Sequence, residues 1–276
     1  MSDFLSDDSF EQFRDLIYNE SGIHFSSSNR TILESRLKER LRISGHPDVM
    51  TYYRSITANA EELKILLDSV TTNLTRFFRN TAHMETFEYY VVPDLIKTKR
   101  ASGDSRIRIW SAGCSTGEEP YTIAMLAREL LPAGLDIEVV ASDISLKSLM
   151  VGKEAFYGDN RIAGVSDHYL KKYLTRTGNG YQVTDEIRKL VRFDYHNLKN
   201  DSGLRNLDVV FCRNVLIYFD EAAQKASVER FWDAMAPHSY LFIGHSESLF
   251  GMNTRFEFLK TDWACIYRKN QAGTLP

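Results

Sequence analysis

The stretch Arg106-Ile-Arg-Ile-Trp-Ser-Ala-Gly-Cys-Ser-Thr-Gly-Glu-Glu-Pro-Tyr121 decides the fold of this chain. Its isoleucines alternate with arginines as in a buried strand, and its glycines bracket a turn of small residues. Pro120 suits the first turn of a helix that runs to Leu131. Glycines let the backbone approach a ligand, and a helix start offers free N–H groups. The stretch therefore predicts a nucleotide-type cofactor site at the first crossover of a doubly wound α/β sheet.

The turn lacks both common phosphate-binding patterns, Gly-x-Gly-x-x-Gly and Gly-Lys-Ser/Thr. Two acids, Glu118 and Glu119, stand where a phosphate would have to bind, which argues against NAD and ATP. Acids can instead hold the ammonium group of S-adenosylmethionine, so the turn favours that cofactor. A tight packing turn without a ligand is the alternative meaning of such glycine spacing.

Composition and charge describe an ordinary globular protein. The 276 residues are 43% hydrophobic and 26% charged, and no apolar run approaches the ~20 residues that span a bilayer. The acidic N-terminus lacks the pattern of a signal peptide, and a net charge of −3 argues against nucleic acid as a partner. We expect a cytoplasmic protein without membrane insertion. Unpaired cysteines fit a reducing compartment and argue against a metal site: Cys114, Cys212 and Cys265.

Residues 1–80 are expected to form a small all-α domain, followed by a connecting helix and linker over residues 81–104. In both stretches apolar residues recur at helical spacing, and no strand pattern appears. Five helices are expected: two capped by Ser9 and Ser28, one opened by Pro47, and two more over Glu61–Asn73 and Ala82–Lys97.

Residues 105–270 alternate strands with helices, which predicts a mostly parallel sheet covered on both faces. The last two strands have no helix between them and predict a C-terminal antiparallel hairpin. This is the Rossmann-like architecture of class I S-adenosylmethionine enzymes. Residues 157–189 do not fit one crossover, and their turn at Thr177-Gly-Asn-Gly180 predicts a small inserted β-subdomain. The expected strands are 107–111, 137–142, 190–195, 207–212, 240–244, 256–260 and 264–268.

Polar residues follow two of these strands at their carboxyl ends, where ligands bind in such sheets. Asp143 lies about 20 residues beyond the glycine turn, where an acid commonly binds ribose hydroxyls. The alternative is that Asp143 or Ser145 caps the helix that follows. Arg213 and Asn214 end another strand, and Tyr218 follows as either a cleft residue or core. A third polar set interleaves with apolar residues and fits a packed helix end equally well: Asn73, Thr75 and Arg79.

Five motifs combine these residues in one order along the chain. They are Thr-Asn-Leu-Thr-Arg-Phe-Phe-Arg (72–79), Ser-Thr-Gly-Glu-Glu-Pro-Tyr (115–121), Ala-Ser-Asp-Ile (141–144), Phe-Cys-Arg-Asn-Val-Leu-Ile-Tyr-Phe-Asp (211–220) and Gly-His-Ser-Glu-Ser-Leu (244–249). Together they resemble the CheR family, the bacterial chemotaxis receptor methyltransferases. The resemblance covers residues 8–269, and five motifs in register make it specific.

The resemblance implies that the chain transfers methyl groups from S-adenosylmethionine to glutamate side chains on the cytoplasmic helices of chemoreceptors, giving methyl esters. A glutamate, with a reference pKa of about 4.3, is already a carboxylate, so no general base is needed and orientation is expected to dominate. The implied catalytic residues are Arg79 and Tyr218. The implied cofactor-binding residues are Asn73, Thr75, Arg79, Glu118, Asp143, Asn197, Leu198, Arg213 and Asn214.

Basic residues crowd the second expected helix, with five arginines and lysines against two glutamates between residues 30 and 42. Such runs are usually solvated helix faces, but the acidic methylation helices of receptors would fit this one. Arg36 and Arg40 are therefore the predicted docking residues. The turn at residues 177–180 looks shorter than in family members that bind a pentapeptide at the receptor C-terminus, so we expect independence of that peptide.

Other functions stay open at this point. The chain could be a non-catalytic S-adenosylmethionine sensor or a scaffold of a signalling complex, although Arg79 and Tyr218 beside the methyl argue against both. It could also be a methyltransferase of the same fold that acts on another substrate. Turnover separates an enzyme from a sensor or scaffold.

Overall fold

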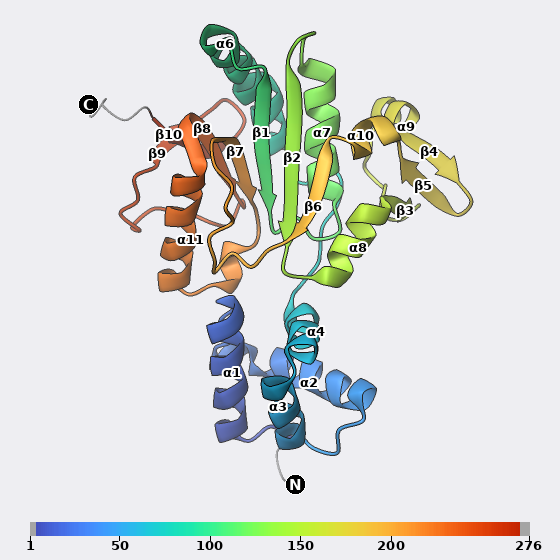
Figure 1. Cartoon of the computed structure of the whole chain (residues 1–276), viewed down its shortest axis with the longest axis vertical. Helices are drawn as coiled ribbons and strands as arrows, with labels where there is room; N and C mark the ends of the chain where they lie inside the picture. Colours follow the sequence, from blue (N-terminus) through green and yellow to red (C-terminus); the bar gives the residue numbers. More distant parts are fainter. Residues whose placement is uncertain (1–3, 271–276) are drawn as a thin grey trace.

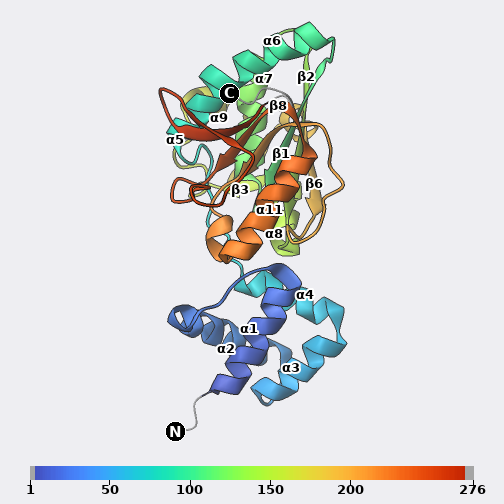
Figure 2. The same ribbon diagram turned by 90° about the vertical axis from the view of Figure 1, so that its left-hand side faces the viewer.

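The computed structural model describes residues 4–270. Its first four helices form the expected small all-α domain, and Figure 1 and Figure 2 show them gathered at one end of the molecule. Their apolar faces enclose a separate core around Phe13, Leu37 and Tyr52. The helices are α1 (Asp7–Ser21), α2 (Arg30–Ser44), α3 (Val49–Ala58) and α4 (Ala60–Val70).

The two predicted serine caps are wrong. Helix α1 begins earlier, because Ser6 has the extended backbone that a cap requires and its side chain accepts from the Ser9 N–H. Ser28 lies inside a short 3-10 turn, η1 (Ser27–Asn29), that precedes α2. Each serine stands near other cap-forming residues, so spacing alone does not identify which one adopts extended backbone.

The connection to the second part of the molecule also differs from the prediction. Helix α4 ends at Val70, because Thr71 turns to extended backbone (φ −76°, ψ 150°). The next helix is interrupted: α5 (Thr81–Thr86) leads through a π-helical turn, η2 (Phe87–Val91), into α6 (Val92–Ser102). Pro93 lacks the N–H that continues a helical ladder, and the wider turn lies just before it.

A 7-stranded sheet in the order β6-β2-β1-β7-β8-β10-β9 confirms the expected Rossmann-like class I methyltransferase architecture. The first five strands in this order, β6, β2, β1, β7 and β8, run parallel to one another. Strand β10 runs antiparallel to both β8 and β9. The predicted C-terminal antiparallel hairpin is therefore confirmed. The strands are β1 (Arg106–Ala112), β2 (Asp136–Asp143), β6 (Val191–Tyr195), β7 (Leu207–Cys212), β8 (Met235–Ile243), β9 (Glu257–Lys260) and β10 (Cys265–Lys269).

Helices cover both faces of this sheet. Successive side chains along β1 point to opposite faces, and both faces are buried. Ile107 and Ile109 belong to one core with residues of α6 and of α7 (Glu118–Leu130). Trp110 points to the other face, where its ring meets Phe231 of α11 (Glu221–Ala234) at 5.5 Å between centroids. Helix α8 (Leu146–Glu154) follows β2.

The inserted β-subdomain is also confirmed. It is a 3-stranded antiparallel sheet in the order β3-β5-β4 that lies beside the main sheet (Figure 1). Its strands are β3 (Phe156–Gly158), β4 (Leu174–Thr177) and β5 (Gly180–Val183), with the short helices α9 (Asp167–Tyr173) and α10 (Asp185–Arg188) around them.

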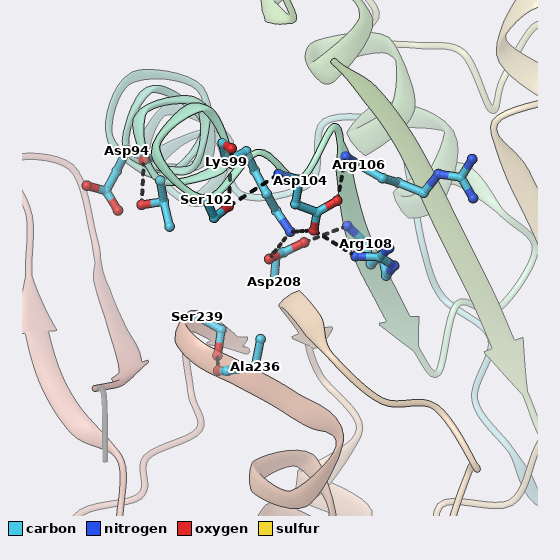
Figure 3. A network of polar contacts seen from close by, with 10 residues as sticks. Asp94, Lys99, Ser102, Asp104, Arg106, Arg108, Asp208, Ala236 and Ser239 are labelled. Carbon is cyan, nitrogen blue, oxygen red and sulfur yellow. Dashed lines mark hydrogen bonds and ion pairs between the residues drawn. The ribbon is translucent and has the colours of Figure 1, made fainter. Parts of the chain in front are cut away.

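A buried polar cluster ties α6 to the amino ends of β1 and β7 (Figure 3). The Lys99 Nζ atom lies 2.8 Å from Asp208 Oδ1 and 2.7 Å from Asp104 Oδ2. The second oxygen of Asp208 accepts from the Arg108 N–H at 2.8 Å. Burial raises the pKa of Asp208, and the Lys99 ammonium opposes that rise. Because ligands bind at the carboxyl ends of such strands, this cluster at the amino ends is structural.

Candidate functional site

A cavity of about 1010 Å³, its open mouth included, lies where the helical domain meets the sheet. The carboxyl ends of β1, β2, β6 and β7 form one wall, and residues 70–79 form another. Ser21 at the end of α1 and Ile23 just after it also line the cavity, and neither was predicted from the sequence. The chain order reverses between β1 and β7, and this switch point is where open α/β sheets bind ligands.

The cavity brings together all the predicted cofactor and catalytic residues except Glu118. These are Asn73, Thr75, Arg79, Asp143, Asn197, Leu198, Arg213, Asn214 and Tyr218.

Of the two adjacent glutamates, Glu119 lines the cavity and Glu118 is directed elsewhere. The Glu119 carboxylate accepts from Ser111 Oγ at 2.8 Å and from Arg213 Nη1 at 3.2 Å. Glu118 is fully buried and faces the inserted β-subdomain, where Arg161 Nη2 lies 2.8 Å from its Oε1. Neighbouring residues on a helix point about 100° apart, so only one of the two can face the cavity. The expectation that Glu118 holds the cofactor is not supported by this placement.

The glycine turn (residues 113–117) lies against the end of β2. The N–H groups of Gly113 and Cys114 both donate to the Ser142 carbonyl, at 2.8 and 2.9 Å. Gly113 has φ +82°, and an added Cβ would lie 2.4 Å from Val215 Cγ2. The turn therefore needs glycine here both for its backbone angle and for space.

Asp143 closes the same corner of the cavity. Its two oxygens accept from the N–H groups of Ser115 and Ser145, at 2.7 and 2.8 Å. Burial raises the pKa of Asp143, and these N–H donors oppose the rise. Ser145, not Asp143, caps helix α8 by accepting from Ser148 N. The alternative, a helix cap at Asp143 or Ser145, is therefore wrong for Asp143 and confirmed for Ser145.

Arg213 lies buried between Glu119 and the segment before α5. Besides its bond to Glu119, its Nη2 donates to the Arg79 carbonyl, and its Nε has no hydrogen-bond partner within residues 4–270. Burial raises the pKa of Glu119, and the charges of Arg213 and Arg79 oppose that rise. A buried ion pair of this kind is costly to break from one side.

Residues 71–79 are irregular backbone and not a helix end. Phe77 is buried with its ring edge-on to Tyr157 at 5.0 Å, and the Phe78 N–H donates to Thr122 Oγ1 at 3.1 Å. The aromatic pair therefore anchors the segment, as the packing alternative proposed. Its polar residues nevertheless reach the cavity: Asn73 Oδ1 accepts from Ser115 Oγ at 3.3 Å, and Arg79 also lines the wall.

Tyr218 is held from both domains. Its carbonyl accepts from the His24 N–H at 2.8 Å, next to a β-bridge between Ile23 and Phe219. Its own N–H donates to the Val215 carbonyl at 3.1 Å. The segment that follows α1 therefore fixes the position of this predicted catalytic residue.

Glu247 is the residue of the fifth motif that contacts the turn after β7, and this role was not predicted from the sequence. Its carboxylate accepts from the N–H groups of Asn214 at 2.9 Å and Ile217 at 3.2 Å, and also from that of Gly244. An acid shortly after the strand that neighbours β7 was the only available signal. Glu247 thereby shapes the turn that carries Asn214 and Tyr218.

The two predicted docking arginines have different environments on α2. Arg40 is buried, its guanidinium 2.5 Å from the Glu62 carboxylate and bonded to Tyr52, so its prediction as a docking residue is wrong. It lies three residues after Leu37 and therefore on the core face of the helix. Arg36 is half-buried, and the described residues give its guanidinium no ion-pair partner.

The pKa of His83 on α5 is shifted by burial and by the nearby charge of Arg213. Burial, with the charges of Arg213 and His245, lowers the pKa of His83 from 6.5 to about 4. The unfolded chain therefore binds this proton more readily, and stability is lost as pH falls from 6.5 towards 4. The full loss is about 3 kcal/mol.

We expect His83→Gln to flatten the acid limb of the stability curve by this amount. Urea unfolding followed by tryptophan fluorescence from pH 7 to 4.5 measures it, because the tryptophans Trp110, Trp232 and Trp263 all lie in the sheet domain. An unchanged pH slope in the variant would contradict the prediction.

The residues present fit S-adenosylmethionine. Glu119 offers a negative charge for an ammonium, and Asp143 offers acceptor oxygens for hydroxyls. Two residues of the wall carry buried nitrogen atoms that lack a hydrogen-bond partner among the described residues, Arg213 Nε and His196 Nε2. No group of three or more His, Cys, Asp or Glu side chains within residues 4–270 is arranged to hold a metal ion.

Comparison with known proteins covers both parts of the chain. Two family models match: the CheR methyltransferase all-alpha domain over residues 8–71 and the CheR methyltransferase SAM binding domain over residues 73–265. The chain is 34% identical to "Chemotaxis protein methyltransferase 2" of Vibrio cholerae, over 98% of this chain and 95% of that protein. It is 33% identical to "Chemotaxis protein methyltransferase" of Borreliella burgdorferi (96% and 95%) and 35% identical to that of Escherichia coli (91% and 88%). The chain therefore belongs to the CheR methyltransferase family, and its residues 73–265 are the family's S-adenosylmethionine-binding domain.

Proposed function

We propose that this protein transfers a methyl group from S-adenosylmethionine to glutamate side chains of chemoreceptors, forming glutamyl methyl esters in chemosensory adaptation. The observation that carries the proposal is the cavity, which is lined by Glu119 of α7, by Asp143 and Arg213 at strand ends, and by Arg79 and Tyr218. The similarity to relatives named as chemotaxis methyltransferases, which covers nearly their whole length, supports it.

The cofactor-binding roles follow from the chemistry of the wall. Glu119 would hold the ammonium group in place of Glu118, and Asp143 would hold the ribose hydroxyls. The remaining cofactor contacts are assigned to Asn73, Thr75, Asn197, Leu198, Arg213 and Asn214, all of which line the cavity.

The cofactor, when bound, supplies an electrophilic methyl group on a positively charged sulfur. The substrate glutamate is already ionised near neutral pH, so the protein needs no general base. Arg79 would attract and align the carboxylate, and Tyr218 would complete the wall beside it. Binding in the cavity also removes water, which strengthens the attraction between opposite charges.

The decisive experiment measures transfer of radiolabelled methyl from S-adenosylmethionine to chemoreceptor-containing membranes. Label on receptor bands that mild base releases as methanol would support glutamyl ester formation. Base-stable label would overturn glutamate as the substrate. An absence of label, despite tight binding of S-adenosylhomocysteine, would favour the sensor or scaffold alternative.

We further propose that α2 docks the acidic methylation helices of the receptor through Arg36. Three of the other four basic residues in this stretch are paired, Lys38 with Glu34, Arg30 with Asp7 and Arg40 with Glu62. Arg36→Glu is expected to raise the receptor KM about three- to tenfold, because an attraction becomes a repulsion. Steady-state kinetics on receptor membranes measures this effect.

The control is Arg100→Glu, which makes the same change at an exposed site on α6, at the opposite end of the molecule (Figure 2). Neither variant should change the affinity for S-adenosylhomocysteine. An unchanged receptor KM for Arg36→Glu, or an equal rise for Arg100→Glu, would contradict specific docking.

Two expectations about partners and location stay predictions. Independence of a receptor C-terminal pentapeptide rests on the short Gly178-Asn179 connection between β4 and β5. Cytoplasmic location rests on the composition of the sequence. Among the described residues, none of the helices combines the length and apolar character of a membrane span.

A further inference from the structure

We infer that Arg161, carried by the inserted β-subdomain, is a positioning residue for the cofactor: it holds the glycine turn in shape through Thr116 and Glu118. The inference deepens the proposed function and rests on it. It also assigns a role to Glu118, which does not line the cavity: Glu118 pairs with Arg161 beneath the turn.

Three polar contacts join the subdomain to the turn. The Arg161 Nη2 atom donates to Thr116 Oγ1 at 2.6 Å and lies 2.8 Å from Glu118 Oε1. Thr116 Oγ1 in turn donates to Glu118 Oε2 at 2.7 Å. From β3, the Tyr157 hydroxyl donates to the Thr116 carbonyl at 2.7 Å. Both polar ends of Thr116 are therefore held by residues of the subdomain.

The opposite side of the same turn faces the cofactor cavity. Gly113, Cys114 and Ser115 line the cavity, whereas Thr116, Glu118 and Arg161 do not. The Ser115 N–H donates to Asp143, the proposed ribose ligand. A displacement of Thr116 must therefore move the neighbouring N–H group that orients Asp143.

Packing leaves the turn little freedom to adjust. Gly117 has φ +95°, and an added Cβ would lie 2.8 Å from the Tyr157 hydroxyl and 3.0 Å from Gly152 Cα. The Arg161 guanidinium also lies 5.8 Å from the centre of the Tyr157 ring. The subdomain and the turn thus fit together without spare space, so the position of one is transmitted to the other.

Charge makes Arg161 the critical member of this group. Glu118 is 0% exposed, and Arg161 is the only cation paired with it among residues 4–270. Removal of Arg161 would leave a buried carboxylate without its counter-charge, which favours a rearrangement of the turn. The Arg161 side chain is itself 31% exposed, so its replacement by methionine leaves no large internal void.

The test measures binding of S-adenosylhomocysteine to the full chain by calorimetry, with the fold of each variant checked by circular dichroism. Arg161→Met and Thr116→Val are each expected to raise the dissociation constant about tenfold. Thr116→Ser, which keeps the hydroxyl, should restore the affinity to within about threefold of wild type. The double variant should resemble either single variant, because both remove the same connection.

Arg176→Met is the matched control. Arg176 lies on the same subdomain and pairs with Asp159, but contacts no residue of the turn. Unchanged affinity in Arg161→Met with a lowered melting temperature would overturn the inference, since the contacts would then be only structural. So would an equal loss in Arg176→Met.

The receptor KM supplies a second readout and should stay unchanged in Arg161→Met while the cofactor KM rises. If Arg161→Met fails to fold, the Thr116→Val and Thr116→Ser pair decides the question. Wild-type protein that does not bind S-adenosylhomocysteine would overturn the proposed function and this inference together. Normal wild-type binding with unaffected variants would overturn the inference alone.

Discussion

Replacement of Glu119 by glutamine is expected to raise the dissociation constant for S-adenosylhomocysteine by about two orders of magnitude. The buried Glu119 carboxylate is the counter-charge of Arg213 and the proposed counter-charge of the ligand ammonium. Glutamine keeps the shape and the bond from Ser111 but removes the charge. Truncating one side of a buried, hydrogen-bonded charge pair costs about 2–5 kcal/mol, which is the basis of the estimate.

A shorter ligand makes this prediction specific. 5′-Methylthioadenosine lacks the amino-acid portion, so Glu119→Gln should weaken its binding far less than that of S-adenosylhomocysteine. Glu118→Gln acts only through the glycine turn and should affect the two ligands equally. Calorimetry with both ligands separates the two acids.

Glu129→Gln is the control, because Glu129 lies on the same helix but pairs with His168 and Lys172 outside the cavity. If Glu119→Gln weakens both ligands equally, Glu119 does not contact the ammonium. Selective loss in Glu118→Gln would return that role to Glu118.

The sheet could be predicted from the sequence because its signals are local. Strand β1 alternates isoleucine with arginine, and β7 is a short, mostly apolar run. Each is followed by a glycine or polar residue at the end that binds ligands. The positions of these strand ends in the sequence also predict that Asp143, Arg213 and Asn214 lie close together. All three line the cavity.

What the sequence could not provide depends on side-chain direction and on contacts between distant segments. Glu118 and Glu119 are adjacent and chemically identical, and only the rotation of α7 decides which one faces the cavity. The sequence pattern predicts that Arg40 is a surface charge, because its contacts with Glu62 and Tyr52 form only in the folded domain. Ser21 and Ile23 have no motif at all, because their part in the cavity arises from the contact between the domains.

Gly113→Ala is expected to weaken cofactor binding strongly while leaving a folded protein. The added methyl group would lie 2.4 Å from Val215 Cγ2, far inside van der Waals contact, at a residue with φ +82°. The left-handed backbone alone costs about 1–2 kcal/mol. Relief of the contact requires movement of the glycine turn or of Val215, and both line the cavity. We expect the dissociation constant for S-adenosylhomocysteine to rise at least about 100-fold, the effect of a misplaced binding surface.

Two variants separate the contact from the backbone strain. Gly134→Ala imposes similar strain at φ +87°, with nothing within 4 Å of the new methyl group, and should lower the melting temperature without changing cofactor affinity. Adding Val215→Ala to Gly113→Ala removes the contacted methyl groups but not the strain, so it should recover much of the affinity and little of the stability. Recovery of both would assign the effect to crowding alone, whereas recovery of neither would assign it to the backbone of the turn. Wild-type affinity in Gly113→Ala itself would mean that the ligand does not approach this turn, and the proposed site would be wrong.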